Sequence, residues 1–256
     1  MKRKTEIWAH RGASGYAPEN TLEAFRKAAE MKADGVELDI QLTKDGELVV
    51  IHDERVNRVS DGNGYVRDFT YEELRKLDVS RPMPSYGTVH IPTLAQVLEE
   101  LKPTGMVVNI ECKTGIIFYP ELEEKMVRLV KDMGMTERIW CSSFNHESVL
   151  KVQKLCPEMK TGFLVSDVIA DVADYVKRYG VHALHPPVHH MQEEGLLDRC
   201  RQKGIAVHIW TVNDKAQMRR FAAAGADAVI TNYPDVAAEV LDNNNPDGTA
   251  HDGIQK

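Results

Sequence analysis

The chain has 256 residues, of which 43% are hydrophobic and 28% charged, and its formal net charge is −7. This composition is typical of a soluble globular enzyme and excludes a fibrous or disordered chain. Nucleic acid is not an expected partner, because binding a phosphate backbone requires a basic face. A length near 250 residues suits one large domain, such as a single eight-stranded barrel.

The four cysteines lie far apart and form no CxxC pair, so we expect buried thiols rather than a zinc site or a disulfide framework. The segment Met1–Glu6 is charged and only a short apolar run follows it, so neither a signal peptide nor a membrane span is expected. These features predict a cytoplasmic protein without stable membrane association. The polar residues 243–256 are expected to form a flexible tail.

Short β-branched runs alternate with amphipathic patterns along the chain, which indicates a parallel sheet covered by helices. The expected barrel strands are Glu6–Ala9, Val36–Ile40, Met106–Glu111, Ile139–Ser142, Thr161–Leu164, Ala183–His185, Ala206–Trp210 and Ala228–Thr231. The expected helices between them are Thr21–Lys32, Leu94–Leu101, Pro120–Met133, Glu147–Leu155, Val168–Tyr179, Gln192–Lys203, Lys215–Ala224 and Pro234–Leu241. Eight such units in a chain of this length favour a closed α/β fold, the TIM (β/α)8 barrel, over an open doubly wound sheet.

The first expected helix has a clear start signal. Asn20 is the expected N-cap and Glu23 follows three residues later, while Leu22 and Phe25 begin an apolar stripe.

One region breaks the alternation of strands and helices. Val36–His52 indicates a hairpin whose two strands are joined at Lys44–Gly46. Residues 53–91 follow, with scattered Gly and Pro and one short helical pattern at Tyr71–Leu77. A connection this long inside a compact domain usually carries function. We therefore expect one catalytic domain over residues 1–242, with residues 53–91 inserted over the barrel mouth.

Acidic side chains mark two neighbouring barrel strands. Glu37 and Asp39 are two residues apart and share one face of a strand, and Glu111 and Lys113 repeat this arrangement on the next barrel strand. Three converging carboxylates would raise one another's pKa, and a divalent cation would relieve this repulsion. Oxygen ligands favour Ca²⁺ or Mg²⁺ over zinc. The alternative is a structural ion network in which Arg11 and Lys113 neutralise the carboxylates.

Two histidines stand where strands are expected to end. An imidazole titrates near neutrality, so His10 and His52 can divide the roles of general base and general acid. The alternative is that each is a structural imidazole with satisfied hydrogen bonds. An unbroken hairpin would place His52 across from Leu38, on the face away from Asp39, so a bulge or a strand end must redirect it.

Cationic and aromatic side chains lie at the same predicted rim. Arg11 and Lys113 suit the non-bridging oxygens of a phosphodiester, unless they only neutralise carboxylates. Trp210 ends a barrel strand and is expected to form a pocket wall, although a core position is the alternative. Phe144 is a second candidate for the same wall.

These residues fall within longer sequence blocks. The blocks are His10–Thr21 (HRGASGYAPENT), Glu37–Gly46 (ELDIQLTKDG) and Val50–Asp53 (VIHD), with shorter ones at Ile91–Leu94, Asn109–Lys113, Trp210–Asn213 and Thr231–Pro234. Through them the chain resembles the glycerophosphodiester phosphodiesterase family from Ile7 to about Val240.

The resemblance implies a barrel with a small insertion after the second histidine. It also implies metal-dependent hydrolysis of glycerophosphodiesters to glycerol 3-phosphate and an alcohol. The roles that it implies are an acid–base pair in His10 and His52, cation ligands in Glu37, Asp39 and Glu111, phosphate contacts from Arg11 and Lys113, and a glycerol-side wall from Trp210. The attacking oxygen is either water or the glycerol 2-hydroxyl, and the two histidine roles are exchangeable.

The chain departs from the family pattern at Cys112, Asn232 and His185. None of these departures removes a group that the chemistry needs, and His185 is expected to alter the pocket.

Two other functions stay open. A lysophospholipase D-like activity would prefer an apolar mouth, whereas the insertion contains Asp61, Asn63, Arg67 and Asp68. A non-catalytic phosphodiester-binding protein would have lost a histidine or a carboxylate, and none is missing. The expected partner is a small-molecule glycerophosphodiester, and a homodimer is compatible with the sequence.

Overall fold

A closed barrel of parallel strands forms the centre of the protein, in a computed structural model that describes residues 3–242. The barrel strands are β1 (Glu6–His10), β2 (Gly35–Leu42), β4 (Val107–Cys112), β5 (Ile139–Ser143), β6 (Lys160–Leu164), β7 (Ala183–His185), β8 (Ala206–Ile209) and β9 (Ala228–Thr231). Strand β1 pairs with both β9 and β2, which closes the ring. The predicted (β/α)8 barrel is therefore confirmed. The predicted tail at 243–256 lies outside the described residues.

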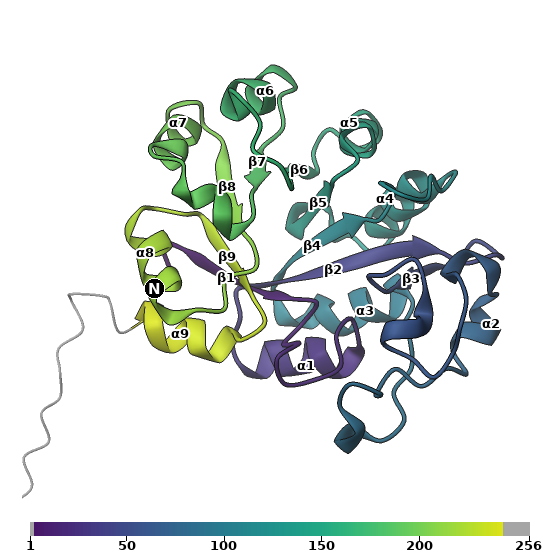
Figure 1. Cartoon of the computed structure of the whole chain (residues 1–256). Coiled ribbons are helices and arrows are strands. Elements are labelled where there is room, and N and C mark those ends of the chain that lie inside the picture. Colours follow the sequence, from purple (N-terminus) through teal and green to yellow (C-terminus); the bar gives the residue numbers. More distant parts are fainter. Residues whose placement is uncertain (1–2, 243–256) are drawn as a thin grey trace, which may run out of the picture.

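Helices surround the strand ring (Figure 1). They are α1 (Leu22–Glu30), α2 (Tyr71–Leu74), α3 (Leu94–Leu101), α4 (Leu122–Asp132), α5 (His146–Leu155), α6 (Val172–Arg178), α7 (Leu196–Gln202), α8 (Lys215–Ala223) and α9 (Pro234–Asp242). Within residues 3–242, none of the helices has the length and apolar character needed to cross a membrane. The four cysteines are buried and free, as expected.

Three helices begin more than one residue later than predicted, and the backbone gives the reason. The residue before each of them, Glu121, Asp171 and Gly195 respectively, has a φ of 64°, 53° and 76°. A residue in this left-handed region cannot continue a right-handed helix. Helices α4, α6 and α7 therefore begin directly after these positions.

The predicted N-cap of the first helix is wrong by one residue. Thr21 caps α1, because its hydroxyl oxygen accepts a hydrogen bond from the Ala24 amide at 3.2 Å. Asn20 instead has a φ of 58°, and its side-chain amide donates to Asp39 Oδ2 at 2.8 Å. Asn20 therefore bonds to Asp39 on β2, although the local sequence predicted that it would cap the helix.

Strand β3 (Leu48–Val50) pairs antiparallel with β2 and starts the long segment that precedes α3. This segment has an apolar cluster of its own, in which Val49 and Ile51 pack with Val56, Val66 and Leu74. The expected helical pattern appears as α2, beside β3 at one edge of the ring in Figure 1. That residues 53–91 cover the barrel mouth stays a prediction.

Aromatic and imidazole rings fill part of the barrel interior. The His208 ring centroid lies 4.3 Å from that of Trp8 and 4.7 Å from that of Trp140, and His208 Nδ1 lies 2.9 Å from His185 Nε2. Gly162 makes room for this packing, because a Cβ atom there would lie 2.3 Å from His185 Nε2. The interior is therefore closely filled beneath the carboxyl ends of the strands.

We expect Gly162→Ala to destabilise the protein by about 1–3 kcal/mol, because the new methyl group overlaps the His185 ring. Urea unfolding measures the change. Gly115→Ala is the matched control, since nothing lies within 4 Å of a Cβ atom there, and its effect should stay within about 0.5 kcal/mol. Equal stability of the two variants would contradict the packing described above.

Candidate active site

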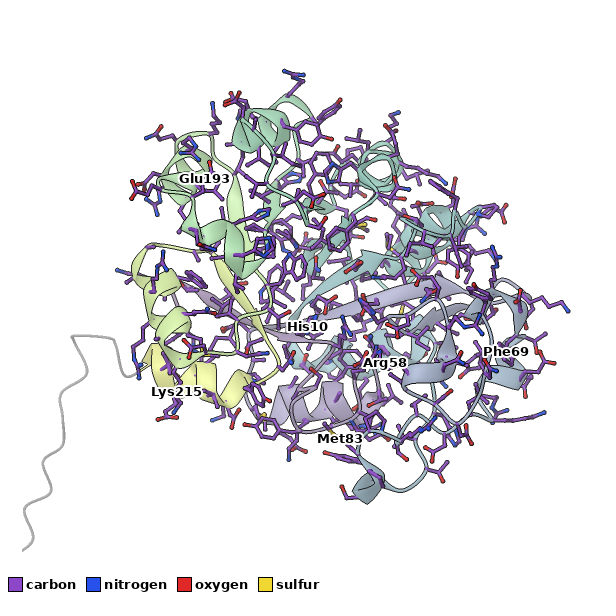
Figure 2. The ribbon with its side chains drawn as sticks, viewed as in Figure 1. His10, Arg58, Phe69, Met83, Glu193 and Lys215 are labelled. Carbon is purple, nitrogen blue, oxygen red and sulfur yellow. The ribbon has the colours of Figure 1, made fainter. Side chains whose placement is uncertain are left out.

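Most of the predicted site residues meet in one cavity at the carboxyl ends of the strands. Figure 2 shows His10 near the centre of the strand ring and Arg58 on the side of the long segment. The cavity is lined by His10, Arg11, Glu37, His52, Asn109, Glu111, Phe144, Leu164, His185, Trp210 and Ile230. Asp39 and Lys113 lie just behind this lining, within 3.9 Å of each other.

Three buried carboxylates form the centre of the site. One oxygen from each of Glu37, Asp39 and Glu111 lies within 4.8 Å of the other two. Strands β2 and β4 produce this arrangement, because Asp39 is paired with Glu111 in the sheet register. Asp39 Oδ1 has no hydrogen-bond partner among the described residues, and Lys113 Nζ is 3.9 Å away.

Burial and mutual repulsion strongly affect these carboxyl groups. Burial, followed by the charges of Asp39 and Glu111, raises the pKa of Glu37 well above its usual value. Burial also raises the pKa of Glu111. At Asp39 burial acts in the same direction, but Arg11 and Lys113 outweigh it and lower the pKa to about 2. Arg11 and Lys113 therefore compensate the charge of Asp39 well, whereas the charges of Glu37 and Glu111 are compensated poorly.

The network around the cavity holds more acidic than basic side chains. Its carboxylates are Glu19, Glu37, Asp39, Asp53 and Glu111. Its permanent cations are Arg11, Arg58 and Lys113. Five carboxylates and three cations leave an excess of two negative charges, which one divalent cation would balance. The hard oxygen ligands fit Ca²⁺ or Mg²⁺. The donor set and the unpaired Asp39 oxygen thus suit a metal ion.

His52 reaches the site because β3 ends before it. The strand stops at Val50, and the Ile51 amide donates to the Asp39 carbonyl at 3.0 Å. His52 Nδ1 lies 2.6 Å from Asp53 Oδ1, and its Nε2 lies 3.2 Å from Lys113 Nζ. Since the carboxylate accepts and the ammonium donates, the neutral ring carries its proton on Nδ1. A strand end therefore redirects His52, as the hairpin pattern required.

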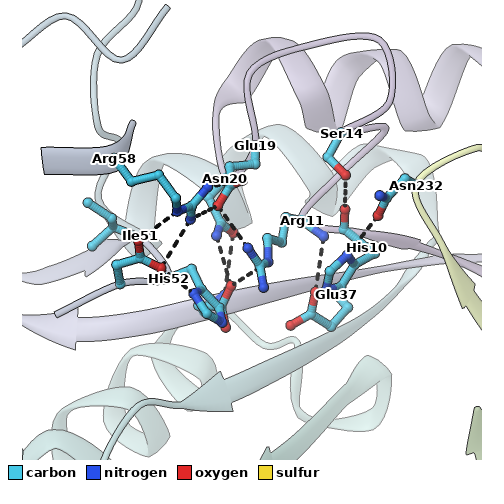
Figure 3. Close-up of polar contacts among 12 residues, drawn as sticks. His10, Arg11, Ser14, Glu19, Asn20, Glu37, Ile51, His52, Arg58 and Asn232 are labelled. Carbon is cyan, nitrogen blue, oxygen red and sulfur yellow. Dashed lines mark hydrogen bonds and ion pairs between the residues drawn. The ribbon is translucent and has the colours of Figure 1, made fainter. Parts of the chain in front are cut away.

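His10 is fixed in a similar way by an uncharged group. Its Nδ1 lies 2.7 Å from Asn232 Oδ1, and its Nε2 lies 4.0 Å from Glu37 Oε2 (Figure 3). An amide oxygen only accepts, so the His10 proton lies on Nδ1 and Nε2 carries the lone pair. Burial, together with the charge of Arg11, lowers the pKa of His10 to about 4. His10 is therefore neutral near pH 7.

Arg58 joins the long segment to the site. Its guanidinium group donates to Glu19 at 2.7 and 2.8 Å and to Asp53 at 2.6 Å (Figure 3). Glu19 also accepts a hydrogen bond from Arg11 at 2.9 Å. Arg58 thus connects Arg11 and His52 through one carboxylate on each side.

The sequence interpretation missed several hydrogen bonds that position the site residues. They are made by the side chains of Glu19, Asn20, Asp53, Arg58, Asn109 and Asn232. Most of them stand inside or next to the sequence blocks that contain the predicted site residues, so this proximity was a usable signal. Their partners depend on loop conformation, which the blocks alone do not specify.

Aromatic rings form one wall of the cavity. Trp210 Nε1 donates to the His185 carbonyl at 2.8 Å, and the Trp210 and Phe144 rings meet edge to face with centroids 5.6 Å apart. Both side chains line the cavity, and Phe144 is 39% exposed. This geometry fits the wall positions predicted for them.

Comparison with known proteins places the chain among phosphodiesterases. The Glycerophosphoryl diester phosphodiesterase family pattern matches residues 10–236. A glycerophosphodiester phosphodiesterase of Caldanaerobacter subterraneus subsp. tengcongensis is 43% identical over 239 residues, 93% of this chain and 98% of that protein. One of Bacillus subtilis is 36% identical, covering 91% of this chain and 85% of that protein. The structure of an Oleispira antarctica phosphodiesterase with the product sn-glycerol-3-phosphate has a TM-score of 0.87 at 29% identity, covering 93% and 96% of the two chains.

We expect Glu37→Gln, Asp39→Asn and Glu111→Gln each to weaken Ca²⁺ or Mg²⁺ binding by at least about tenfold, measured by isothermal titration calorimetry. Because burial raises the pKa of Glu37 and Glu111, protons compete with the cation, and affinity falls as the pH is lowered. Glu123→Gln is the control, since this buried carboxylate pairs with Lys151 outside the cavity. Unchanged affinity in all three site variants would refute the assignment.

Proposed function

The chain belongs to the glycerophosphoryl diester phosphodiesterase family and has this enzyme activity, and we propose that it acts by metal-dependent acid–base catalysis with His10 and His52. The products would be glycerol 3-phosphate and an alcohol, in line with the product bound to the Oleispira antarctica relative. The observation that carries the proposal is the meeting of both imidazoles with three buried carboxylates at one cavity.

The groups bonded to the two imidazoles support different roles. Asp53 is anionic and lies against His52 Nδ1, where it supplies a counter-charge to an imidazolium ring, and Lys113 Nζ lies 3.2 Å from His52 Nε2. Asn232 is neutral and supplies no counter-charge to a protonated His10, and burial together with the charge of Arg11 lowers the pKa of His10 despite the Asn232 hydrogen bond. We therefore assign His10 as the base, accepting a proton at Nε2. His52 would act as the acid in its doubly protonated form, in which Nε2 carries the proton that passes to the departing alkoxide and no longer accepts from Lys113.

Charged and aromatic groups would position the substrate around this pair. Arg11 and Lys113 would bind the non-bridging phosphate oxygens, and Trp210 and Phe144 would form the wall on the glycerol side of the substrate. Glu37, Asp39 and Glu111 would hold Ca²⁺ or Mg²⁺, which polarises a phosphoryl oxygen as a Lewis acid when bound. His10 serves equally whether the attacking oxygen belongs to water or to the glycerol 2-hydroxyl.

A lysophospholipid is a second candidate substrate, and exposed apolar side chains favour it. Ile116 and Phe118 follow β4 and are 75% and 76% exposed, and Val168 follows β6 and is 68% exposed. An acyl chain would bury part of this apolar surface. The polar insertion argues for the smaller glycerophosphodiesters. The cytoplasmic location and the homodimer stay predictions from the sequence.

A substrate panel tests the proposed function. We expect purified protein to hydrolyse glycerophosphocholine and glycerophosphoethanolamine, with glycerol 3-phosphate released in a coupled assay. EDTA should abolish turnover, and added Mg²⁺ or Ca²⁺ should restore it. Full activity after removal of metal would overturn the metal-dependent mechanism, and faster turnover of lysophosphatidylcholine would favour the second candidate.

We also propose that residues 53–91 cover the mouth and select the head group. Replacing residues 61–87 with a short Gly/Ser linker keeps Arg58 and should change the ranking within the same substrate panel more than it lowers thermal stability. An unchanged ranking in the folded variant would leave the segment with a structural role only.

The two histidines are tested by their response to the leaving group. His10→Ala and His52→Ala should each lower kcat on glycerophosphocholine by about 10²–10⁴-fold while substrate binding persists. A p-nitrophenyl phosphodiester needs little protonation of its departing oxygen, so His52→Ala should recover most activity on it and His10→Ala should not. Recovery in His10→Ala instead would mean that the roles are exchanged. Full turnover by both variants on glycerophosphocholine would exclude the acid–base pair.

A further inference from the structure

Three buried polar atoms of the cavity lining have no hydrogen-bond partner within residues 3–242, and one of them, Arg11 Nε, belongs to a residue with a proposed role. The other two are Asn109 Oδ1 and His185 Nδ1, and neither residue is among those assigned a role above. Asn109 is 1% exposed and His185 is fully buried. An unpaired buried polar atom is unfavourable, so two in the same cavity point to a ligand that bonds them.

The Asn109 amide is held in one orientation by the neighbouring strand. Its Nδ2 donates to the Ser142 hydroxyl at 3.0 Å, which leaves Oδ1 as the unused acceptor. Asn109 precedes Glu111 by two residues on the same face of β4. It therefore lies roughly 6–7 Å deeper along the strand than the carboxylate. A ligand whose phosphate lies at Glu111 would extend its other end toward Asn109.

His185 is held just as firmly by the barrel interior. Its Nε2 lies 2.9 Å from His208 Nδ1, and the ring packs over Gly162, where any Cβ atom would overlap it. Burial lowers the pKa of His185 to about 3, so the ring is neutral near pH 7. Its Nδ1 is a donor or an acceptor, depending on which of the two rings donates in the His185–His208 hydrogen bond.

We propose that Asn109 and His185 form a subsite for the hydroxyl groups of the glycerol moiety and select substrates whose buried end is a polyol. A hydroxyl group donates to Asn109 Oδ1 and either donates to or accepts from His185 Nδ1, so it suits both tautomers. Neither residue is charged, so a charged group at this depth would lose its hydration without a counter-charge. The glycerol end thus enters first, and the variable alcohol faces the mouth.

This subsite rests on the proposed function, and a binding experiment separates the two. The affinities of sn-glycerol 3-phosphate and of propyl phosphate, which lacks both hydroxyl groups, are compared by isothermal titration calorimetry in the presence of Mg²⁺. We expect wild-type protein to bind the glycerol ester at least about tenfold more tightly, because each unpaired atom gains a hydrogen bond. Equal binding of the two esters by wild-type protein would overturn the subsite without any variant.

Variants then assign the preference to the two residues. His185→Phe and Asn109→Leu should each reduce the preference to threefold or less by weakening the glycerol ester alone. His146→Phe is the matched control, because His146 does not line the cavity and its imidazole bonds the Tyr175 hydroxyl and the Leu164 carbonyl. Folded variants of Asn109 and His185 that keep the full preference would overturn the assignment.

The outcomes distinguish the two levels of the proposal. Protein that prefers the glycerol ester but hydrolyses no glycerophosphodiester would contradict the proposed function and support the subsite. Protein that hydrolyses glycerophosphocholine yet binds both esters equally would contradict the subsite alone.

Discussion

Repulsion among three buried carboxylates is the constraint on which the site depends. Glu37, Asp39 and Glu111 are brought within 4.8 Å by the register of two parallel strands, so the barrel itself creates the unfavourable charge. Arg11 and Lys113 relieve only part of it, which is why the pKa of Glu37 remains raised while that of Asp39 is low. The repulsion that remains is compatible with a further positive charge at this site, such as a divalent cation.

Much of the site follows from strand periodicity, which the sequence displays directly. Residues two apart on a strand share a face, so the spacing of Glu37 and Asp39 alone places their side chains together. The need to redirect His52 could be anticipated as well, because an unbroken hairpin register would place this side chain on the face away from Asp39. Each of these inferences uses only local geometry along or across one pair of strands.

The features that the sequence analysis predicted wrongly or missed do not follow from local geometry. Each depends on a partner distant in sequence or on a single backbone angle. Asn20 and Thr21 both suit an N-cap, and the contact of Asn20 with Asp39 decides between them. Helices α4 and α6 begin later than predicted because Glu121 and Asp171 have left-handed backbone angles, which these residue types do not indicate. His185 and His208 meet across β7 and β8, and neither residue's own sequence neighbours indicate the other.

The overlap between Gly162 and His185 has a consequence for how the protein changes over generations. A larger side chain at position 162 is tolerated only after the ring at position 185 has shrunk, and that order passes through a cavity in the barrel, whereas the reverse order passes through a steric overlap. Mutational paths through this pair are therefore ordered rather than free. Because His185 also lines the substrate cavity, a substitution of Gly162 on β6 that requires a smaller residue at position 185 on β7 would also change ligand recognition.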